Sequence, residues 1–452
     1  MTTFVAGRVE YKYAMTMTDA STIFALSSGP GKAGVAVIRV SGPNAHAVLE
    51  SMAAPMPKPR EAAFRAIRHP KTGAILDRAV VLFFAAPKSE TGEDVAELQV
   101  HGGRAVVAAV LEALGAIPGC RLAEPGEFAR RAFENGKIDL AEVEGLADLI
   151  DAETEAQRHQ ALAQAGGALS KLYEGWRARL IEIAALVEAS IDFADEGDVG
   201  AKSFAAACER AEPLLTDVSA HLNDGHRGEI LRDGFRVAIL GAPNAGKSSL
   251  LNTLARREAA IVSEEAGTTR DVIEVRLDLD GYPVILSDTA GVREAGGSIE
   301  REGIRRSLAV ADDADLVLWL SETGLGSPPE SISREMCLRI RTKADLMSDA
   351  APPGAISVKT GAGMDQLVRR IAGIARSRLG DQTAPVLTQT RHRLNLEAAA
   401  SSLSDFLAGD ATAPELRAED IRRAAHALGR ITGRVDVEDV LGQIFSRFCI
   451  GK

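Results

Sequence analysis

Gly241-Ala242-Pro243-Asn244-Ala245-Gly246-Lys247-Ser248-Ser249 is the stretch that decides the fold of the domain around it. It fits the spacing G-x-x-x-x-G-K-[ST] and follows an apolar run, residues 235–240, that predicts a buried strand. In such a loop, backbone N–H groups surround phosphate oxygens at the start of a helix, the lysine reaches the outer phosphates and the serine hydroxyl faces Mg²⁺. A chance glycine turn has no reason to combine strand, loop and helix in this order. The sequence therefore predicts a domain that binds a nucleoside triphosphate.

Two later segments have the character of sensors for the outer phosphate. Ser287-Asp288-Thr289-Ala290-Gly291 follows an apolar strand, so that Asp288 can hold Mg²⁺ through water and the Gly291 N–H can meet the γ-phosphate. Between the two motifs lies Gly267-Thr268-Thr269-Arg270-Asp271, whose Thr269 hydroxyl can complete the metal's shell only while the γ-phosphate is present. Such a segment is expected to order on binding and to release on hydrolysis.

The base is predicted from Thr342-Lys343-Ala344-Asp345, at the place where GTPases carry Asn-Lys-x-Asp. The Asp345 carboxylate can accept from guanine's ring N–H and amino group, and it repels adenine, which disfavours an ATPase motor. Ser357-Val358-Lys359 follows at the distance of the last guanine-contacting loop. Thr342 departs from the pattern, since its hydroxyl is shorter than an asparagine side chain and has fewer donors. We expect weaker affinity for GTP but preserved discrimination, because unpaired polar edges reject a wrong base by about 10⁴-fold.

The hydrolysis machinery has one unusual feature. Val292 follows Gly291 where other GTPases carry the glutamine that orients the attacking water, and a valine cannot do this. In other GTPases an arginine finger stabilises the charge that develops on the phosphates in the transition state, and it raises the hydrolysis rate by about 10³- to 10⁵-fold. Another positive group must take that role here. The side-chain carbonyl of Asn244, with backbone carbonyls before Gly267, can bind a monovalent cation beside the phosphates. A potassium ion would then replace the arginine finger.

These features, together with the terminal Cys449-Ile450-Gly451-Lys452, resemble the MnmE (TrmE) family of tRNA modification GTPases from about Thr22 to Lys452. The resemblance implies a GTPase domain that is inserted in a helical domain, follows a folate-binding N-terminal domain, and is activated by potassium and by dimerisation. It places potassium at Asn244, Ser263, Glu265 and Thr268, and Mg²⁺ at Ser248 and Thr269. The full nucleotide-binding set is expected to be Asn244, Ala245, Gly246, Lys247, Ser248, Ser249, Ser263, Glu264, Glu265, Ala266, Gly267, Thr268, Thr269, Asp288, Thr289, Ala290, Gly291, Lys343, Asp345, Ser357, Val358 and Lys359.

Two residues are candidates for catalysis. Glu300 matches the glutamate thought to orient the water network in the family; the alternative is an exposed charge at a helix start, which is favourable there in any case. Cys449 lies close to Lys452, where a thiolate with a lowered pKa could act as nucleophile or acid, and the alternative is an inert cysteine.

The resemblance also implies a site for 5-formyltetrahydrofolate at a dimer interface. Its expected residues are Arg39, Glu97, Lys137 and Lys452. Arginine and lysine suit the glutamate tail of a folate, and a carboxylate can accept from the pterin N–H groups. Taken singly, each of these residues would be assigned to the charged surface.

Composition and pattern set the domain organisation. The chain has 452 residues with 46% hydrophobic and 25% charged content, ordinary for two or three globular domains. No apolar run of about 18 residues appears, so no membrane span is expected, and a cytoplasmic location is predicted. We expect a multidomain protein with α/β and α parts. Its segments are a disordered or misassigned extension (1–18), an α+β folate-binding domain (19–136), a helical bundle (137–232 and 384–452) and an inserted P-loop, Ras-like GTPase domain (233–383), with hinges at 224–234 and Pro385.

The predicted activity is that of a homodimeric GTP hydrolase that modifies carbon 5 of the wobble uridine of certain tRNAs with a tetrahydrofolate one-carbon unit. The resemblance implies an FAD-dependent partner, MnmG (GidA), since nothing in this chain resembles a flavin-binding loop. The net charge of −11 gives no support for tRNA binding, so that expectation depends on the resemblance. The alternative is a regulatory GTPase switch for ribosome assembly, like Era or Der, without modification chemistry.

Overall fold

The computed structural model describes residues 21–193, 198–257, 273–288, 310–322, 328, 336–347, 352–380, 385–409, 413–435 and 438–452. The chain forms two compact units, one of residues 1–139 with 437–452 and one of residues 140–436. The expected extension 1–18 lies outside the described residues. In the described part, no helix combines the length and the apolar character needed to cross a membrane.

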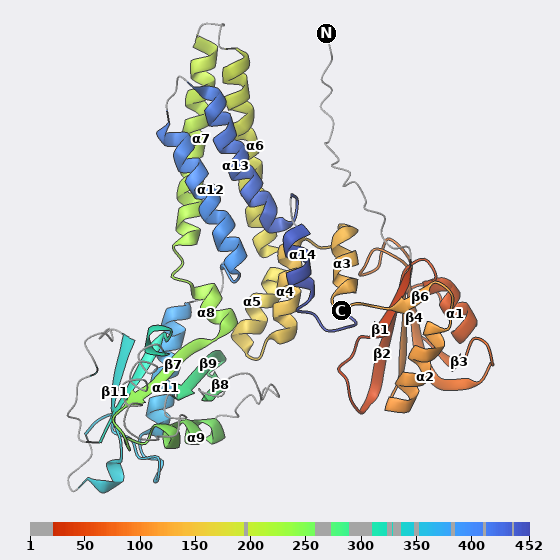
Figure 1. Cartoon of the computed structure of the whole chain (residues 1–452), viewed down its shortest axis with the longest axis horizontal. Coiled ribbons are helices and arrows are strands. Elements are labelled where there is room, and N and C mark those ends of the chain that lie inside the picture. The colour runs from red at the N-terminus through yellow and green to blue at the C-terminus, as the bar shows by residue number, and fades with distance from the viewer. Residues whose placement is uncertain are drawn as a thin grey trace, which may run out of the picture. The chain divides into compact units, whose positions relative to one another are not determined.

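The first unit is a mixed α/β domain built on one sheet (Figure 1). The order of its described strands is β3-β4-β5-β2-β1-β6, antiparallel except where β6 joins β1. The strands are β1 (Thr22–Leu26), β2 (Ala33–Ser41), β3 (Ala63–Arg68), β4 (Ile75–Phe84), β5 (Val95–Gly102) and β6 (Cys120–Leu122). The helices are α1 (Ala45–Ala53), α2 (Arg104–Gly115), α3 (Glu127–Glu134) and α14 (Glu438–Phe445).

The alternation of side chains along β1 gives the sheet two distinct faces. Phe24 packs in the main core with buried residues of α1 and α2. Ile23 and Ala25 point the other way and pack with Phe128 of α3. The unit combines strands and helices, as expected for an α+β domain, and polar residues of β2 and β5 on the α3 face belong to the candidate site described below.

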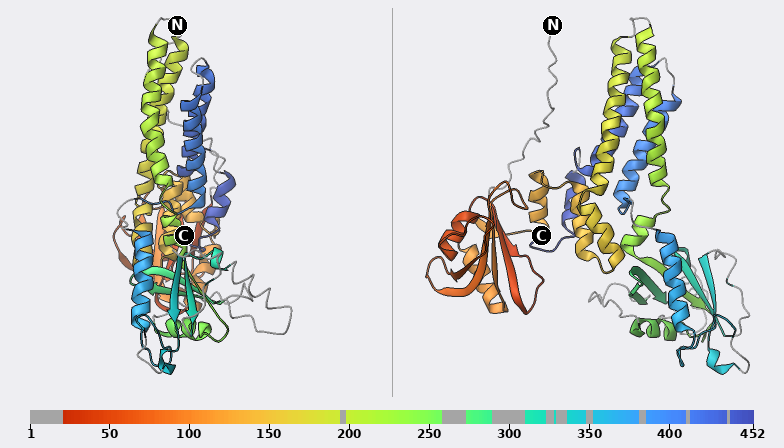
Figure 2. Two further views of the ribbon diagram at one scale, coloured as in Figure 1. Left: turned by 90° about the vertical axis from the view of Figure 1, so that its left-hand side faces the viewer. Right: turned by 180° about the vertical axis from the view of Figure 1, so that it is seen from behind.

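The second unit begins with helices. These are α4 (Leu140–Asp151), α5 (Glu155–Ala165), α6 (Ala168–Asp192), α7 (Asp198–Leu222) and α8 (Arg227–Asp233), and after the α/β segment α12 (Thr390–Ala408) and α13 (Pro414–Thr432). The long helices α6, α7, α12 and α13 lie side by side around one apolar core (Figure 2). Residues 152–154 separate α4 from α5, and Thr154 caps α5 by accepting from the Gln157 N–H.

Between α8 and α12 lies a sheet with the described order β11-β10-β7-β9-β8, in which only β8 runs antiparallel. Its elements are β7 (Phe235–Gly241), α9 (Lys247–Arg257), β8 (Ile273–Leu279), β9 (Tyr282–Asp288), β10 (Leu316–Ser321), β11 (Cys337–Arg341), η3 (Ala344–Leu346) and α11 (Met364–Leu379). Apolar residues of α9 and α11 cover one face. The strand, loop and helix order predicted around Lys247 is confirmed, and parallel strands place their carboxyl ends, where ligands bind, along one edge.

The assignment of residues 384–452 to a single helical part differs from the structure. Residues 437–452 group with the N-terminal unit. There, a bridge pairs Ile450 with Pro125, and Gly451 lies against Leu26. The physical reason is the positive φ of 104° at Gly451, which lets the backbone approach β1 so closely that a Cβ would lie 2.2 Å from the Leu26 oxygen.

Candidate functional site

The phosphate loop spans the gap between the end of β7 and the start of α9. Gly241 has φ 146°, and a Cβ there would lie 2.3 Å from the backbone oxygen of Leu320, its register neighbour on β10. Gly246 and Asn244 also have positive φ, at 91° and 61°. The loop is therefore shaped by backbone conformations that glycine adopts without strain and asparagine tolerates.

The lysine of this loop folds back over it. Lys247 donates from Nζ to the backbone oxygens of Gly241 and Ala242, both at 3.1 Å. The ammonium group thus lies within hydrogen-bond distance of two backbone oxygens of the loop that leads into α9. An anion bound there would meet a full positive charge as well as the helix N-terminus.

The serine after the lysine contacts the aspartate that ends β9. Ser248 Oγ donates to Asp288 Oδ2 at 2.6 Å, and Asp288 is fully buried. The contact depends on the sheet, since Asp288 is the register partner of Ile239 on β7. A hydroxyl and a carboxylate are oxygen ligands of the kind that Mg²⁺ takes, directly or through water. The structure therefore brings together two residues that lie forty positions apart in the sequence.

The predicted base-recognition residues also meet. Asp345 Oδ1 accepts from Ser357 Oγ at 2.6 Å, and Ser357 is fully buried beneath the exposed aspartate. That hydrogen bond, aided by the charges of Lys359 and Lys343, lowers the pKa of Asp345. The carboxylate is thus ionised at neutral pH and fixed in orientation, as an acceptor for two N–H donors must be.

Two residues that precede Asp345 in the chain, Thr342 and Lys343, belong to the same predicted motif. Lys343 has φ 58° and forms an ion pair with Glu322, a residue that the sequence pattern gave no reason to single out. Thr342 is 3% exposed, and its hydroxyl has no hydrogen-bond partner among the described residues. An asparagine at this position would carry donors that the threonine lacks.

Part of the predicted nucleotide site lies outside the described residues. This holds for Ser263, Glu264, Glu265, Ala266, Gly267, Thr268, Thr269, Thr289, Ala290, Gly291 and Glu300.

In the first unit, two of the four predicted folate residues form one cluster. Arg39 on β2 and Glu97 on β5 are register partners, with Nη2 and Oε1 3.2 Å apart. Glu90 adds a second carboxylate at 2.6 Å, and the guanidinium lies 5.8 Å from the centre of the Phe128 ring. Neither Glu90 nor Phe128 was predicted, because their positions depend on pairings between segments far apart in the chain.

Lys137, in the turn between α3 and α4, lies against the loop between β4 and β5 that carries Glu90. Its Nζ donates to the Pro87 oxygen at 2.8 Å, and its Cδ lies 3.3 Å from the place of a Cβ on Gly92. The terminal segment with the exposed Cys449 and the half-buried Lys452 belongs to this unit as well. The four predicted residues therefore occupy one unit, and a direct contact is seen between Arg39 and Glu97.

Two family models match the chain. The model described as "GTP-binding protein TrmE N-terminus" covers residues 22–137, and the model described as "MnmE helical domain" covers residues 140–449. Together they span both units, including the α/β segment that carries the phosphate loop.

Curated relatives match over nearly the full length. The tRNA modification GTPase MnmE of Parvibaculum lavamentivorans is 56% identical over 95% of this chain and 100% of its own. That of Methylorubrum populi is 53% identical over 96% of this chain and 100% of its own. Among solved structures, the G domain of the T. maritima FeoB iron transporter is 24% identical and covers 31% of this chain and 98% of its own, with a TM-score of 0.22.

Proposed function

Since the chain belongs to the MnmE family of tRNA modification GTPases and is accordingly a GTP hydrolase, we propose that potassium activates it and that it modifies carbon 5 of the wobble uridine of certain tRNAs. In this proposal it uses a tetrahydrofolate one-carbon unit, works as a homodimer in the cytoplasm, and depends on the FAD-containing MnmG (GidA). The observation that carries the GTPase part is the Ser248–Asp288 contact beside the phosphate loop.

Each described residue of the nucleotide site has a role in this proposal. The loop Asn244 to Ser249 holds the phosphates, with Lys247 on the outer ones. Ser248, with Thr269, holds Mg²⁺, which would spread the charge that develops on the γ-phosphate. Asp345 accepts from guanine, and Ser357 keeps that carboxylate oriented. Lys343, Val358 and Lys359 complete the pocket for the base.

The potassium proposal rests on Asn244. Asn244 belongs to the phosphate loop, where it has φ 61°, and its amide oxygen is a suitable ligand for a monovalent cation. Ser263, Glu265 and Thr268 are the proposed further ligands, and Glu300 is proposed to orient the water. The cation would supply the positive charge that the sequence otherwise lacks beside Val292.

The folate proposal rests on the cluster around Arg39. A guanidinium held by two carboxylates and placed over an aromatic ring has a fixed position, and such an arginine can clamp the carboxylate of a glutamate tail. Glu97 would accept from the pterin, and Lys137 and Lys452 would add positive charge. Cys449 is proposed to act in the modification chemistry, because it lies on the same unit as this cluster.

We further propose that the α/β segment, residues 233–383, is a domain inserted in the helical domain. In support of this, α12 and α13 follow the segment in sequence but pack with α6 and α7, which precede it. The proposed N-terminal folate domain, residues 19–136, is joined in space by residues 437–452.

The first test is GTP hydrolysis by the purified protein in KCl and in NaCl at equal ionic strength. We expect strong stimulation by potassium that is lost in Asn244→Ala, since the amide oxygen is removed while the loop glycines remain. GTP binding measured in parallel separates loss of the cation from loss of the nucleotide. Equal rates in both salts would refute the potassium role and favour a regulatory switch GTPase.

A further inference from the structure

The two chain segments that connect the GTPase fold to the helices run in contact with each other. Gly228 in α8 faces residue 387 of the returning segment so closely that a Cβ would lie 2.1 Å from the Leu387 oxygen. Arg393 at the start of α12 bonds to both Asp224 and Glu229, at 2.9 and 3.0 Å. These are the places where the sequence predicted hinges, and the structure shows them joined by buried ion pairs.

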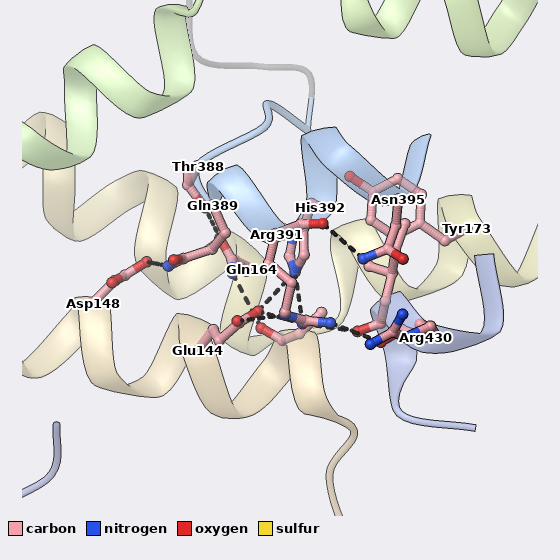
Figure 3. A network of polar contacts seen from close by, with 12 residues as sticks. Glu144, Asp148, Gln164, Tyr173, Thr388, Gln389, Arg391, His392, Asn395 and Arg430 are labelled. Atoms are coloured by element: carbon pink, nitrogen blue, oxygen red, sulfur yellow. Dashed lines mark hydrogen bonds and ion pairs between the residues drawn. The ribbon is translucent and has the colours of Figure 1, made fainter. Parts of the chain in front are cut away.

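The same two segments are bound to the helices beneath them. Asp148 on α4 accepts from Gln389 of the returning segment at 2.9 Å (Figure 3). It also accepts from Arg232 of α8 at 3.0 Å. Thr388 donates to Gln164 of α5 at 2.8 Å. Entry and exit of the GTPase fold are therefore fixed to one pair of helices, α4 and α5.

An ion pair at the start of α12 forms the centre of this network. Glu144 of α4 accepts two bonds from Arg391, at 3.0 and 2.8 Å, and one from His392 Nε2 at 2.7 Å (Figure 3). Arg391 also donates to the backbone oxygens of Arg430 and Ile431 on α13. Burial alone would raise the pKa of Glu144, but His392 and Arg391 lower it to about 2, so the carboxylate stays charged.

From His392 the contacts continue into the helical bundle. Its ring meets the edge of Tyr173 on α6, with centroids 5.9 Å apart, and the Tyr173 hydroxyl lies 3.3 Å from Nε2 of His221 on α7. Tyr173 and His392 are almost fully buried. Residues from α4, α6, α7, α12 and α13 thus share one continuous set of buried contacts.

On the other side, α5 contacts the sheet of the GTPase fold. The Ala156 N–H donates to the Gly281 oxygen at 3.1 Å, in the turn between β8 and β9. Glu153 and Arg276 of β8 are 3.6 Å apart. Strand β9 ends at Asp288, the partner of Ser248, so the contacted hairpin is the one that leads into the nucleotide site.

We propose that this network, defined as Glu144, Asp148, Gln164, Thr388, Gln389, Arg391 and His392, is a rigid coupling that passes the nucleotide state of the GTPase domain to the helical bundle. It rests on the proposed function and deepens it, because it names the residues through which hydrolysis would act on the rest of the molecule. Packed groups that are linked by buried hydrogen bonds and ion pairs have discrete arrangements, so a displacement of the β8–β9 hairpin is transmitted through α5 and α4 instead of being absorbed in a linker.

The test is hydrogen exchange of the full chain in KCl, with GDP alone and with GDP plus aluminium fluoride, which mimics the transferred phosphoryl group. In the wild type we expect the change of nucleotide to alter amide protection in α9 and also in α12. In Glu144→Gln we expect the change in α9 to persist and the change in α12 to vanish. We also expect GTP hydrolysis within about twofold of wild type and tRNA modification reduced by about 5-fold or more, the size of typical couplings.

Two other variants make the result decisive. Glu182→Gln removes an exposed carboxylate of the bundle that pairs with Arg210, and it should leave both changes intact. Thr388→Val keeps shape and removes a single buried bond, so it decides the question if Glu144→Gln does not fold.

The proposal is overturned if the change in α12 survives in Glu144→Gln and Thr388→Val, or if the wild type shows no change there. Failure of the proposed function looks different, because the wild type would then show no potassium-stimulated hydrolysis or no tRNA modification, whatever its pattern of exchange.

Discussion

At the residue scale, Thr342 shows how a departure from a motif is accommodated. The backbone keeps its place, since the Thr342 N–H donates to the Ser321 oxygen at 2.9 Å. The side chain, however, is 3% exposed and its hydroxyl is unpartnered among the described residues. The neighbouring Asp345–Ser357 bond is intact, so the orientation of the carboxylate that we propose to select guanine does not depend on the threonine.

We therefore predict that Thr342→Val leaves the affinity for GTP within about threefold and raises the free energy of unfolding. A buried hydroxyl without a hydrogen bond costs about 1 to 3 kcal/mol, and valine has nearly the same shape. Nucleotide titration and urea unfolding measure the two quantities. A loss of GTP affinity of tenfold or more would show that the hydroxyl contacts the nucleotide, and Ser357→Ala, which removes the support of Asp345, provides the comparison.

At the scale of elements, the phosphate loop depends on how closely β7 and β10 approach. Gly241 ends β7 opposite Leu320, with φ 146° and no room for a Cβ. The requirement for glycine at position 241 thus comes from the neighbouring strand β10 as well as from the nucleotide.

Gly241→Ala is predicted to destabilise the GTPase domain by about 3 kcal/mol or more and to abolish GTP binding, because the strands must separate or the loop must change its backbone conformation. Gly373→Ala is the matched control. It lies in α11 with nothing within 4 Å of its Cβ, so it should stabilise the helix by about 0.5–1 kcal/mol. Thermal unfolding with and without GTP measures both. Unchanged GTP binding in Gly241→Ala would contradict the close approach.

At the scale of the whole molecule, each of the two units is built from segments that lie far apart in the chain. The N-terminal unit includes residues 437–452, and the second unit joins helices from both sides of the α/β segment. Several buried charges of the second unit, among them Glu144, Asp148 and Arg393, lie where these segments meet. Such groups are costly to bury, and each of these three is held in an ion pair.

The ion pairs of Glu144 with Arg391 and His392 predict how the free energy of unfolding depends on pH. The pKa of Glu144 is lowered from 4.5 to about 2, so the folded state favours the charged form. The stability that this contributes, about 3 kcal/mol as an order of magnitude, is complete above the unfolded pKa and is lost as the pH falls through the folded pKa. Glu144→Gln should lower the free energy of unfolding at neutral pH by about 3–5 kcal/mol.

The measurement is denaturant unfolding of both proteins between pH 7 and pH 2.5. The difference between wild type and Glu144→Gln should shrink as the pH falls below 4.5. The exposed control Glu182→Gln should follow the wild type throughout. A difference that stays constant down to the lowest pH would mean that the Glu144 charge does not contribute to stability.

Several features of the site were predictable from the residues. The loop at Lys247 and its place between a strand and a helix follow from a motif whose chemistry is local. The roles of Ser248, Asp288 and Asp345 stay predictions, which the contacts of Ser248 with Asp288 and of Ser357 with Asp345 support. Glu90, Phe128 and Glu322 were not predicted, because a charged or aromatic residue has no pattern of its own until a partner is placed beside it. Glu300 and the segment from Ser263 to Thr269 stay predictions.

By itself the sequence determined the nucleotide-binding fold and its preference for guanine, because these depend on backbone groups and side chains within a few positions of each other. Only the tertiary structure decided that the terminal segment joins the N-terminal unit, and that the start of α12 is fixed to α4 by Glu144 with Arg391 and His392, partners 247 and 248 positions away. Such contacts arise when helices from opposite ends of the chain pack together, and packing depends on the whole arrangement of apolar faces, not on any local pattern.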